Sequence, residues 1–284
     1  MQFPTLQIEQ PVLTDEQFVR ICRLVYEHCG INLHEGKKEL VRARLAKMLR
    51  KYRFKTYDQY IDFVLDDPTQ TTFYEMIDQI STNLTSFFRE PKHFEYLRRQ
   101  FLPALIQKKQ KTGQLRIRAW SAGCSSGEEP YSIAITLLEA VPLAQSWDIR
   151  ILASDISTRI LRIAQEGLYE PQRVANLSAE LKSRYLKPKK DKSTPLLYEV
   201  SPALRSILIF KYLNLMDPWP FRGPFDFIFC RNVMIYFDKP TQEKLVQRFH
   251  DVLDNGGLFF TGHSESLTGI RHSFRYIQPT IYRK

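Results

Sequence analysis

The 284-residue sequence is poor in cysteine and has no long apolar run. Its four cysteines form no CxxC pair and no metal-ligand spacing, so we expect free thiols in a reducing compartment and no metal site. The longest apolar stretch, FDFIFCRNVMIYF, is interrupted by Asp226 and Arg231, and the opening residues MQFPTLQIEQ lack the basic and apolar parts of a signal peptide. These absences predict a cytoplasmic protein without a membrane-inserted segment.

The composition is that of an ordinary globular protein, with 43% hydrophobic and 25% charged residues. The net charge of +10 favours an acidic partner. Nucleic acid, an anionic membrane surface and an acidic protein all satisfy this condition. Charge by itself therefore leaves the kind of partner open.

Residues 1–81 are predicted to form an all-helical domain. The segment TDEQFVRICRLVYEHCG begins with Thr14 and Gln17 in capping-box spacing and ends at Gly30, which is typical of a helix. A second helix is expected from 37 to 53, with an apolar stripe on one side and eight basic residues against one acid. Such a charge run is usually a solvated surface, but it also fits an acidic partner.

From residue 115 onward, strand-like segments alternate with helical ones. LRIRAW, DIRILASD, ILIFKYLNL, FDFIFCRN and GGLFFTGH have strand character, whereas STRILRIAQEG and TQEKLVQRFHDVL have helical periodicity. This alternation predicts a mostly parallel, doubly wound α/β sheet over 115–284. Residues 82–114 are expected to form a linker and a helix that begins near Pro91. The long connection 167–205 predicts an inserted β-subdomain with a hairpin in LLYEVSPALRSILIF.

A glycine loop, GCSSG at 123–127, follows the first predicted strand and precedes Glu128 and Glu129. The loop matches neither the GxGxxG of dinucleotide sites nor the GK[ST] of nucleoside-triphosphate sites, and two carboxylates would repel a phosphate. S-adenosylmethionine carries an ammonium, a sulfonium and no phosphate, so an acidic rim suits it. A carboxylate about 4 Å from such a cation gains roughly 4 kcal/mol at an effective dielectric constant of 20. Asp155, at the end of the second predicted strand, is placed to accept hydrogen bonds from a ribose.

Each of these acids also has an ordinary structural explanation. Glu128 and Glu129, beside Pro130, would stabilise any helix N-terminus, and an aspartate after a strand is often a helix cap. Only the combination of the loop with the acids indicates a cofactor site.

Five segments, TNLTSFFRE, WSAGCSSGEEPYS, ASDIS, FCRNVMIYF and GGLFFTGHSES, occur in this order behind the basic helical domain. Together they resemble the bacterial chemotaxis receptor methyltransferase family, CheR, over nearly the full length from about Thr14. The resemblance implies a Rossmann-like class I methyltransferase domain with a small inserted β-subdomain, preceded by an all-α domain. It also implies S-adenosylmethionine-dependent methyl esterification of chemoreceptor glutamates, with S-adenosylhomocysteine as the product.

The resemblance assigns site residues motif by motif. It implies that Glu129 holds the methionine end of the cofactor, Asp155 the ribose, and residues 214–215 the adenine. Arg89 and Tyr236 are the candidates for steering the substrate carboxylate. The full set of implied cofactor contacts is Asn83, Thr85, Arg89, Glu129, Asp155, Asn214, Leu215, Arg231 and Asn232.

A glutamate substrate needs no general base, because its carboxyl group, with a pKa near 4.3, is already ionised at neutral pH. Catalysis then consists mostly of orienting and desolvating that carboxylate. Accordingly, we find no convincing Ser-His-Asp or Cys-His set, and His263 is interpreted as a structural histidine at a strand end. Arg89 and Tyr236 could instead be an ion-paired surface arginine and a buried tyrosine. Gly123 stands where many family members have alanine, a change that we expect cofactor binding to tolerate.

A chemoreceptor substrate would give the basic helix a role. Receptor methylation helices are acid-rich, so Arg44, Lys47 and Arg50 are predicted to steer and dock them. The insertion 167–205 is a candidate docking site for a receptor C-terminal tail, through an exposed strand edge; a passive insertion that covers the sheet is the alternative. We expect a monomer that binds no nucleic acid and is recruited to membrane receptor arrays.

Two other functions fit part of the pattern. A nucleic-acid methyltransferase would use the same cofactor and charge, and DPWP at 217–220 faintly resembles the DPPY loop of amino-methylating enzymes. DPWP lacks the adjacent prolines, however, and precedes the FDFIFC strand instead of following it. The other alternative is a non-catalytic adenosyl-binding module. Tight cofactor binding without turnover on any acidic helical peptide would indicate such a module.

Overall fold

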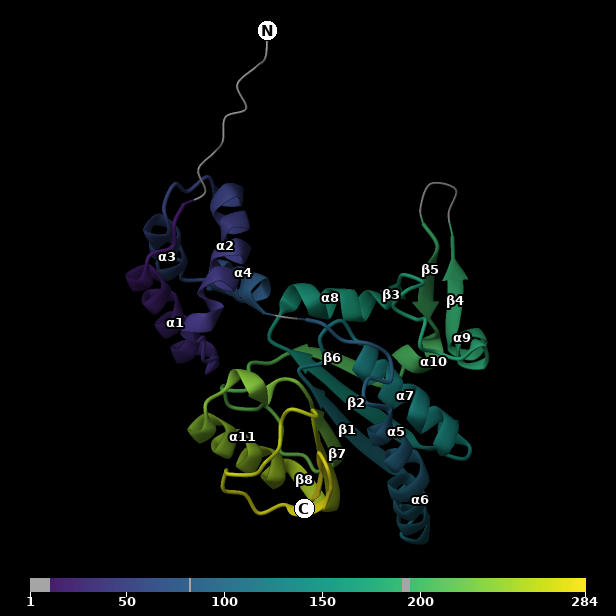
Figure 1. Ribbon diagram of the computed structural model, residues 1–284. Coiled ribbons are helices and arrows are strands. Elements are labelled where there is room, and N and C mark those ends of the chain that lie inside the picture. Colours follow the sequence, from purple (N-terminus) through teal and green to yellow (C-terminus); the bar gives the residue numbers. More distant parts are fainter. Residues whose placement is uncertain (1–10, 82, 191–194) are drawn as a thin grey trace. The chain divides into compact units, whose positions relative to one another are not determined.

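The computed structural model describes residues 11–81, 83–190 and 195–284 (Figure 1). The chain divides into two compact units, Met1–Thr82 and Asn83–Lys284. Parts of the predicted helical domain, linker and insertion, namely residues 1–10, 82 and 191–194, lie outside the described residues.

The first unit contains helices α1 (Asp15–Cys29), α2 (Lys38–Tyr52), α3 (Tyr57–Leu65) and α4 (Thr71–Ile80), with a short 3-10 turn, η1 (Glu35–Lys37), before α2. The predicted capping box at α1 is confirmed, because the Thr14 hydroxyl accepts a hydrogen bond from the Gln17 amide at 3.2 Å. Thr56 and Gln59 repeat the arrangement at α3. Gly30 ends α1 in the left-handed conformation, with a φ of 67°.

Helix α2 packs through its predicted apolar stripe. Four residues of that stripe are buried: Val41, Leu45, Met48 and Leu49. The fifth, Tyr52, is half-buried and donates a hydrogen bond from its hydroxyl to Glu75 at 2.6 Å. Lys47 and Arg50 are exposed. The stripe therefore fixes α2 within its unit while these two cations face solvent.

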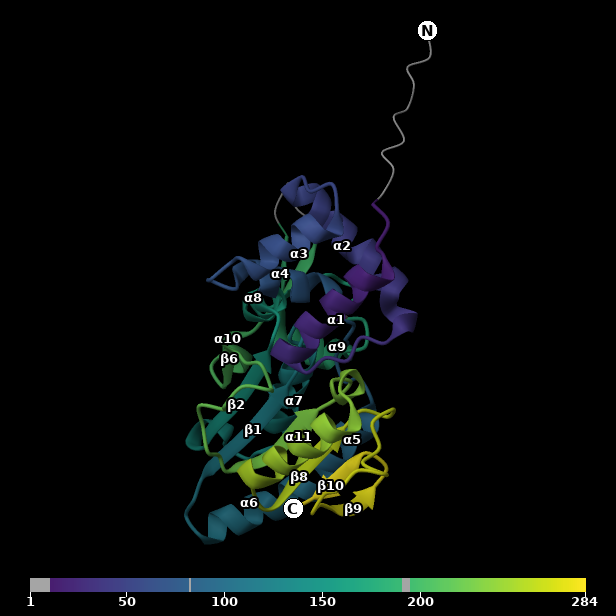
Figure 2. The ribbon, with the colours of Figure 1, turned by 90° about the vertical axis from the view of Figure 1, so that its left-hand side faces the viewer.

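The second unit is organised around a seven-stranded sheet with the order β6-β2-β1-β7-β8-β10-β9. Its strands are β1 (Arg116–Ala122), β2 (Asp148–Asp155), β6 (Leu208–Tyr212), β7 (Phe225–Cys230), β8 (Leu253–Thr261), β9 (Arg275–Gln278) and β10 (Ile281–Arg283). Strands β6, β2, β1, β7 and β8 are parallel, which confirms the predicted sheet, whereas β10 is antiparallel to β8 and to β9. Figure 2 shows β8, β10 and β9 following one another at one side of the sheet.

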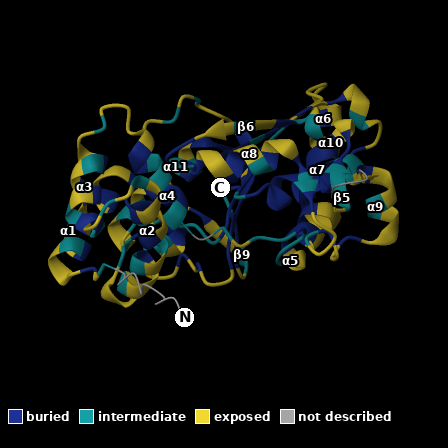
Figure 3. Cartoon of the chain, turned by 90° about the horizontal axis from the view of Figure 1, so that it is seen from above, coloured by how far each residue is buried: buried dark blue, intermediate teal, exposed yellow. Residues whose placement is uncertain are grey.

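Helices cover both faces of this sheet. Helices α6 (Leu102–Lys111) and α7 (Glu128–Ala140) lie on one side, and α11 (Lys239–Val252) lies on the other (Figure 1). Helix α5 (Pro91–Tyr96) continues through a π-helical turn, η2 (Leu97–Phe101), into α6, and it begins at the predicted Pro91. Because both faces are covered, all six residues of β7 are buried, and Figure 3 shows the central strands as buried.

The chain order of the strands reverses direction between β1 and β7. From β1 the chain moves to β2 and β6 on one side, and it returns to β7 and β8 on the other. Ligands of doubly wound sheets bind outside the carboxyl ends of the strands at such a switch point. The loop after β1 and the residues after β7 therefore border the expected binding crevice.

A three-stranded antiparallel sheet, with the order β3-β5-β4, follows helix α8 (Thr158–Glu166). It contains β3 (Leu168–Tyr169), β4 (Leu186–Lys189) and β5 (Leu197–Val200), with α9 (Ala179–Tyr185) before β4 and α10 (Pro202–Arg205) after β5. The predicted hairpin within LLYEVSPALRSILIF is wrong, because β5 pairs with β4 and β3 while SILIF enters the main sheet as β6. Helix α10 separates the two strands of the expected hairpin. No helix in the described ranges is long and apolar enough to cross a membrane.

Candidate functional site

The glycine loop joins β1 to α7 and is fastened to the end of β2. The amides of Gly123 and Cys124 donate to the Ser154 carbonyl at 2.8 and 2.9 Å, and the Ser125 amide donates to Asp155 Oδ2 at 2.8 Å. A Cβ on Gly123, whose φ is 78°, would overlap the Cγ2 methyl of Val233. The loop of this chain therefore needs glycine at this position, and our expectation that cofactor binding tolerates glycine here stays a prediction.

Asp155 ends β2 with its carboxylate almost fully buried. Besides the Ser125 amide, it accepts a hydrogen bond from the Ser157 amide at 2.9 Å. The helix-cap explanation does not apply, because the N-cap of α8 is Ser157, whose hydroxyl accepts from the Ile160 amide at 3.1 Å. Asp155 is thus an oriented carboxylate at the carboxyl edge of the sheet.

Glu129 forms a buried ion pair that the sequence did not reveal. Its Oε2 lies 2.7 Å from Arg231 Nε, and its Oε1 accepts from the Ser121 hydroxyl at 2.7 Å. The side chains of Arg231 and Glu129 are 2% and 8% exposed. The acidic rim therefore already has a cationic partner within the protein.

Arg231 also connects the end of β7 to the segment before α5. Its Nη1 donates to the Arg89 carbonyl at 2.6 Å and to His93 Nδ1 at 3.2 Å, and it lies 3.3 Å from Glu90 Oε2. The Nε2 atom of His93 lies 2.6 Å from Thr280 Oγ1. Burial, assisted by the nearby Arg231 charge, lowers the pKa of His93 to about 3. His93 is therefore a neutral acceptor for Arg231 at neutral pH.

Glu90, His93 and His263 have the chemistry of metal ligands, with donor atoms within 4.8 Å of one another. The Arg231 guanidinium lies within 3.3 Å of the first two, so a positive charge already occupies this position. The side chain of His263 is 59% exposed, and its amide donates to Glu90 Oε1 at 3.2 Å.

Glu265, in the GHSES segment, shapes the loop after β7. Its buried carboxylate accepts hydrogen bonds from the amides of Asn232 and Gly262, each at 2.7 Å, and from that of Ile235 at 3.1 Å. Burial raises the pKa of Glu265, and these backbone hydrogen bonds oppose the rise. Sequence reasoning missed Glu265, Glu90 and His93.

The structure brings several other predicted residues to the same edge. The Ser125 hydroxyl donates to the Asn83 carbonyl at 3.0 Å, and Arg89 Nη1 donates to the Leu84 carbonyl at 2.9 Å. The remaining predicted residues are half-buried or buried in the segments 83–90, 213–217 and 231–237: Thr85, Asn214, Leu215, Asn232 and Tyr236. Asn214 is oriented by Asp217, which accepts from its Nδ2 at 3.1 Å.

The predicted docking residues of α2 do not share one environment. Arg44 is half-buried, and its Nη1 donates to the carbonyls of Ile80 and Ser81, the latter at 2.8 Å. Arg44 therefore caps the C-terminus of α4. Lys47 and Arg50 are exposed and remain candidates for a binding surface.

The DPWP segment has a packing role. The Trp219 ring lies 4.7 Å from that of Trp120, and the guanidinium of Arg248 lies 4.1 Å from the Trp219 ring. Arg248 also donates to the Asp217 carbonyl at 2.5 Å. These contacts account for DPWP without a substrate base.

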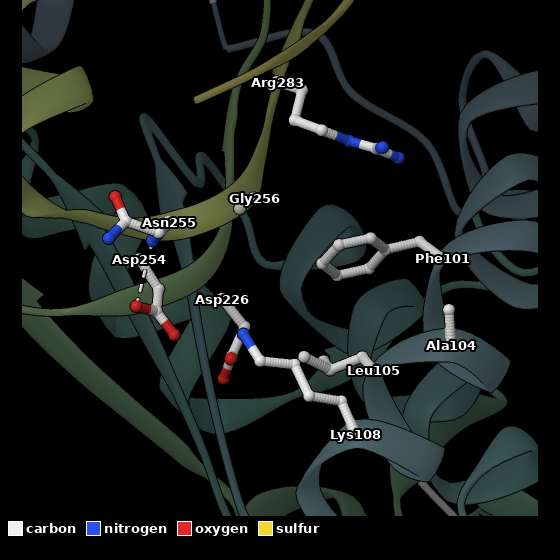
Figure 4. Close-up of a pocket in the computed structure, with 10 residues that line it drawn as sticks. Phe101, Ala104, Leu105, Lys108, Asp226, Asp254, Asn255, Gly256 and Arg283 are labelled. Atoms are coloured by element: carbon white, nitrogen blue, oxygen red, sulfur yellow. Dashed lines mark hydrogen bonds between the residues drawn. The ribbon is translucent and has the colours of Figure 1, made fainter.

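A small cavity of about 180 Å³ lies at the opposite edge of the sheet, near the amino ends of β7 and β8 (Figure 4). Asp226 and Gly256 line it together with Phe101 and Arg283. Asp226 itself is paired with Lys109 at 2.5 Å. This cavity is separate from the loop at 123–127 and from Arg231.

The strand order, the glycine loop after β1 and the carboxylate that ends β2 define a class I S-adenosylmethionine-dependent methyltransferase. The buried acids suit a cationic, phosphate-free cofactor. Residues 83–283 match the family described as "CheR methyltransferase, SAM binding domain", and residues 16–81 match "CheR methyltransferase, all-alpha domain". The chain therefore belongs to the CheR methyltransferase family, with S-adenosylmethionine as its cofactor.

Curated relatives agree over nearly the whole chain. A chemotaxis protein methyltransferase of Borreliella burgdorferi is 42% identical over 96% of this chain and 95% of its own length. Chemotaxis protein methyltransferase 2 of Pseudomonas aeruginosa is 39% identical over 95% and 93%. The Escherichia coli chemotaxis protein methyltransferase is 36% identical over 96% and 92%. The predicted family, fold class and cofactor are confirmed.

Proposed function

We propose that this chemotaxis methyltransferase transfers the methyl group of S-adenosylmethionine to glutamate side chains of chemoreceptors, forming methyl esters. The supporting observation is the 36–42% identity to chemotaxis protein methyltransferases over nearly the whole chain. Within the site, His93 is buried between Arg231 and Thr280, and burial lowers its pKa to about 3. Such a histidine is a poor general base at neutral pH. The substrate should therefore be nucleophilic as it stands, which an ionised carboxylate is and an exocyclic base amine is not.

We assign the cofactor to the crevice at the carboxyl edge. In this proposal Asp155 accepts hydrogen bonds from the ribose hydroxyls, and Glu129 faces the ammonium while keeping Arg231 as its partner. The segment at 214–215 borders the adenine. The full set of proposed contacts is Asn83, Thr85, Arg89, Glu129, Asp155, Asn214, Leu215, Arg231 and Asn232.

When bound, the cofactor would supply an electrophilic methyl group that a substrate carboxylate can accept. Arg89 and Tyr236 orient the incoming carboxylate. Arg89 is held by the Leu84 carbonyl, and its other guanidinium nitrogens are available to donate toward a carboxylate. Tyr236 lies half-buried in η4 (Met234–Tyr236), directly after the loop fixed by Glu265. Catalysis by this arrangement is orientation and desolvation, with no proton to remove.

The product of the reaction tests this proposal directly. The protein is incubated with methyl-labelled S-adenosylmethionine and separate receptor, DNA and RNA fractions. Label should enter the receptor fraction and leave it as volatile methanol in mild alkali, because esters hydrolyse there. Replacing the modified receptor glutamates with alanine should abolish the signal. Alkali-stable label in a nucleic acid would refute the proposal, and tight cofactor binding without any transfer would indicate a non-catalytic module.

We further propose that Lys47 and Arg50 dock the acid-rich receptor helices. Both are exposed on α2, whereas Arg44 is engaged at the end of α4. Electrostatic complementarity chiefly affects association and orientation, so added salt should weaken the reaction. This surface would recruit the protein to receptor arrays at the membrane.

The β4 edge of the small sheet is a second proposed receptor contact. β4 lies at the end of the strand order β3-β5-β4, and residues 187–189 are exposed. An extended receptor tail could add to this edge by main-chain hydrogen bonds. Pro188 supplies no N–H, which shortens the pairing that the edge can offer. Equal methylation of a receptor with and without its C-terminal tail would refute this contact.

A further inference from the structure

A second ion pair lies against the glycine loop and comes from the segment after β3. Arg173 Nη2 lies 2.5 Å from Glu128 Oε1 and donates to the Ser126 hydroxyl at 2.6 Å. That hydroxyl donates in turn to Glu128 Oε2 at 2.7 Å. Glu128 and Ser126 are fully buried, whereas the Arg173 side chain is 34% exposed. The guanidinium thus provides the counter-charge for a carboxylate that water does not reach.

Tyr169, in β3, contacts the same loop. Its hydroxyl donates to the Ser126 carbonyl at 2.7 Å, and a Cβ on Gly127 would lie 2.7 Å from that hydroxyl. The Arg173 guanidinium lies 5.6 Å from the Tyr169 ring. Gly127 has a φ of 98°, so both its backbone conformation and this close approach require glycine.

Tyr169 and Arg173 are anchored independently of the loop. Tyr169 pairs with Tyr198 of β5, and Val174 and Leu177 beside Arg173 are buried in the main core. The segment 168–177 is therefore a rigid support on one side of the loop. The two acids at the start of α7 consequently have separate partners, Arg173 for Glu128 and Arg231 for Glu129.

We propose that Arg173 is a positioning residue of the cofactor site. Through Glu128 and Ser126 it holds the loop 123–127 and the first turn of α7 in the conformation that binds S-adenosylmethionine, without contacting the cofactor or the substrate itself. The proposal rests on the cofactor placement given above. A buried carboxylate that loses its partner must be protonated or must turn toward water, and either change moves the loop.

Calorimetry with S-adenosylhomocysteine as the probe tests this role. Arg173→Met should weaken binding roughly ten-fold, and Arg173→Lys, which keeps the charge but not the planar guanidinium, should fall between it and wild type. In the methylation assay the KM for S-adenosylmethionine should rise, while kcat at saturating cofactor and the KM for receptor stay near wild type. Arg184→Met is the matched control, because Arg184 pairs with Glu139 at 2.6 Å with half of its side chain exposed. Wild-type affinity is expected for this control.

The following outcomes decide the proposal. Unchanged affinity in folded Arg173→Met overturns it, as does a lower unfolding temperature with no change in the dissociation constant. Where Arg173→Met does not fold, Arg173→Lys carries the test, and wild-type affinity in folded Arg173→Lys overturns the proposal equally. Asp155→Ala distinguishes the cofactor placement from the positioning role of Arg173. Unchanged affinity in Asp155→Ala refutes the cofactor placement. Weakened binding by Asp155→Ala together with normal binding by Arg173→Met refutes only the positioning role.

Discussion

Replacing Arg231 with methionine should destabilise the second unit strongly. Arg231 lies 2.7 Å from Glu129 and 3.3 Å from Glu90, and the three side chains are at most 9% exposed. Removing one partner of a buried ion pair leaves an uncompensated charge and costs about 3–5 kcal/mol. The variant also removes a donor from the Arg89 carbonyl and from His93. We therefore expect a loss of at least about 3 kcal/mol, a large share of the roughly 5–15 kcal/mol that stabilises a folded protein.

Tryptophan fluorescence during urea unfolding measures the stability of the second unit. The sequence has three tryptophans, Trp120, Trp147 and Trp219, and all three lie in the second unit. The midpoint for Arg231→Met should fall well below that of wild type. Arg99→Met is the control, because Arg99 forms an exposed pair with Glu95 whose loss should cost about 0–1 kcal/mol.

The double variant Glu129→Gln, Arg231→Met separates charge from packing. Replacing a buried pair by neutral residues is often close to neutral, so the double variant should recover part of the stability that the single variant loses, although Glu90 still lacks Arg231. A midpoint for Arg231→Met equal to that of Arg99→Met would refute the reasoning. A double variant less stable than Arg231→Met would show that packing, not an unpaired charge, dominates.

Three other variants or conditions give independent tests. Gly123→Ala should weaken the binding of S-adenosylhomocysteine, measured by calorimetry. Adding Val233→Ala to this variant should restore part of the affinity, because it removes the overlapping methyl group. Full affinity in Gly123→Ala alone would contradict the proposed loop geometry. Replacing Lys47 and Arg50 with glutamate should lower receptor methylation at least about ten-fold without changing cofactor affinity. Replacing two exposed lysines of α6, at 108 and 111, with glutamate changes the net charge equally and should leave methylation unchanged. Near-normal methylation by the Lys47 and Arg50 variant would exclude the docking surface. Burial lowers the pKa of His93 to about 3 from 6.5, so its contribution to stability is complete above pH 6.5 and is lost at about 1.4 kcal/mol per pH unit as the pH falls toward 3. His93→Gln should flatten that part of the stability profile in urea titrations, and an unchanged slope would contradict the assignment.

Local patterns predicted the parts of the fold that depend on neighbouring residues. The capping box at Thr14, the end of α1 at Gly30 and the start of α5 at Pro91 all depend on contacts within one helical turn. The alternation of strands and helices likewise predicted a parallel sheet, because a parallel connection needs a crossover. The hairpin failed for the opposite reason: which strands pair is decided by the whole sheet, and β6 joined β2.

The sequence by itself determined the glycine loop, the carboxylate at Asp155 and the family, because each is written in contiguous residues. Only the tertiary structure decided which charges meet. Arg231 reaches Glu129 across 102 positions and His93 across 138, and Arg44 reaches the end of α4 instead of solvent. Periodicity places a side chain on a face of its own helix or strand, but the partner on that face comes from a distant element. A buried charge must have a partner, and packing alone selects which one it finds.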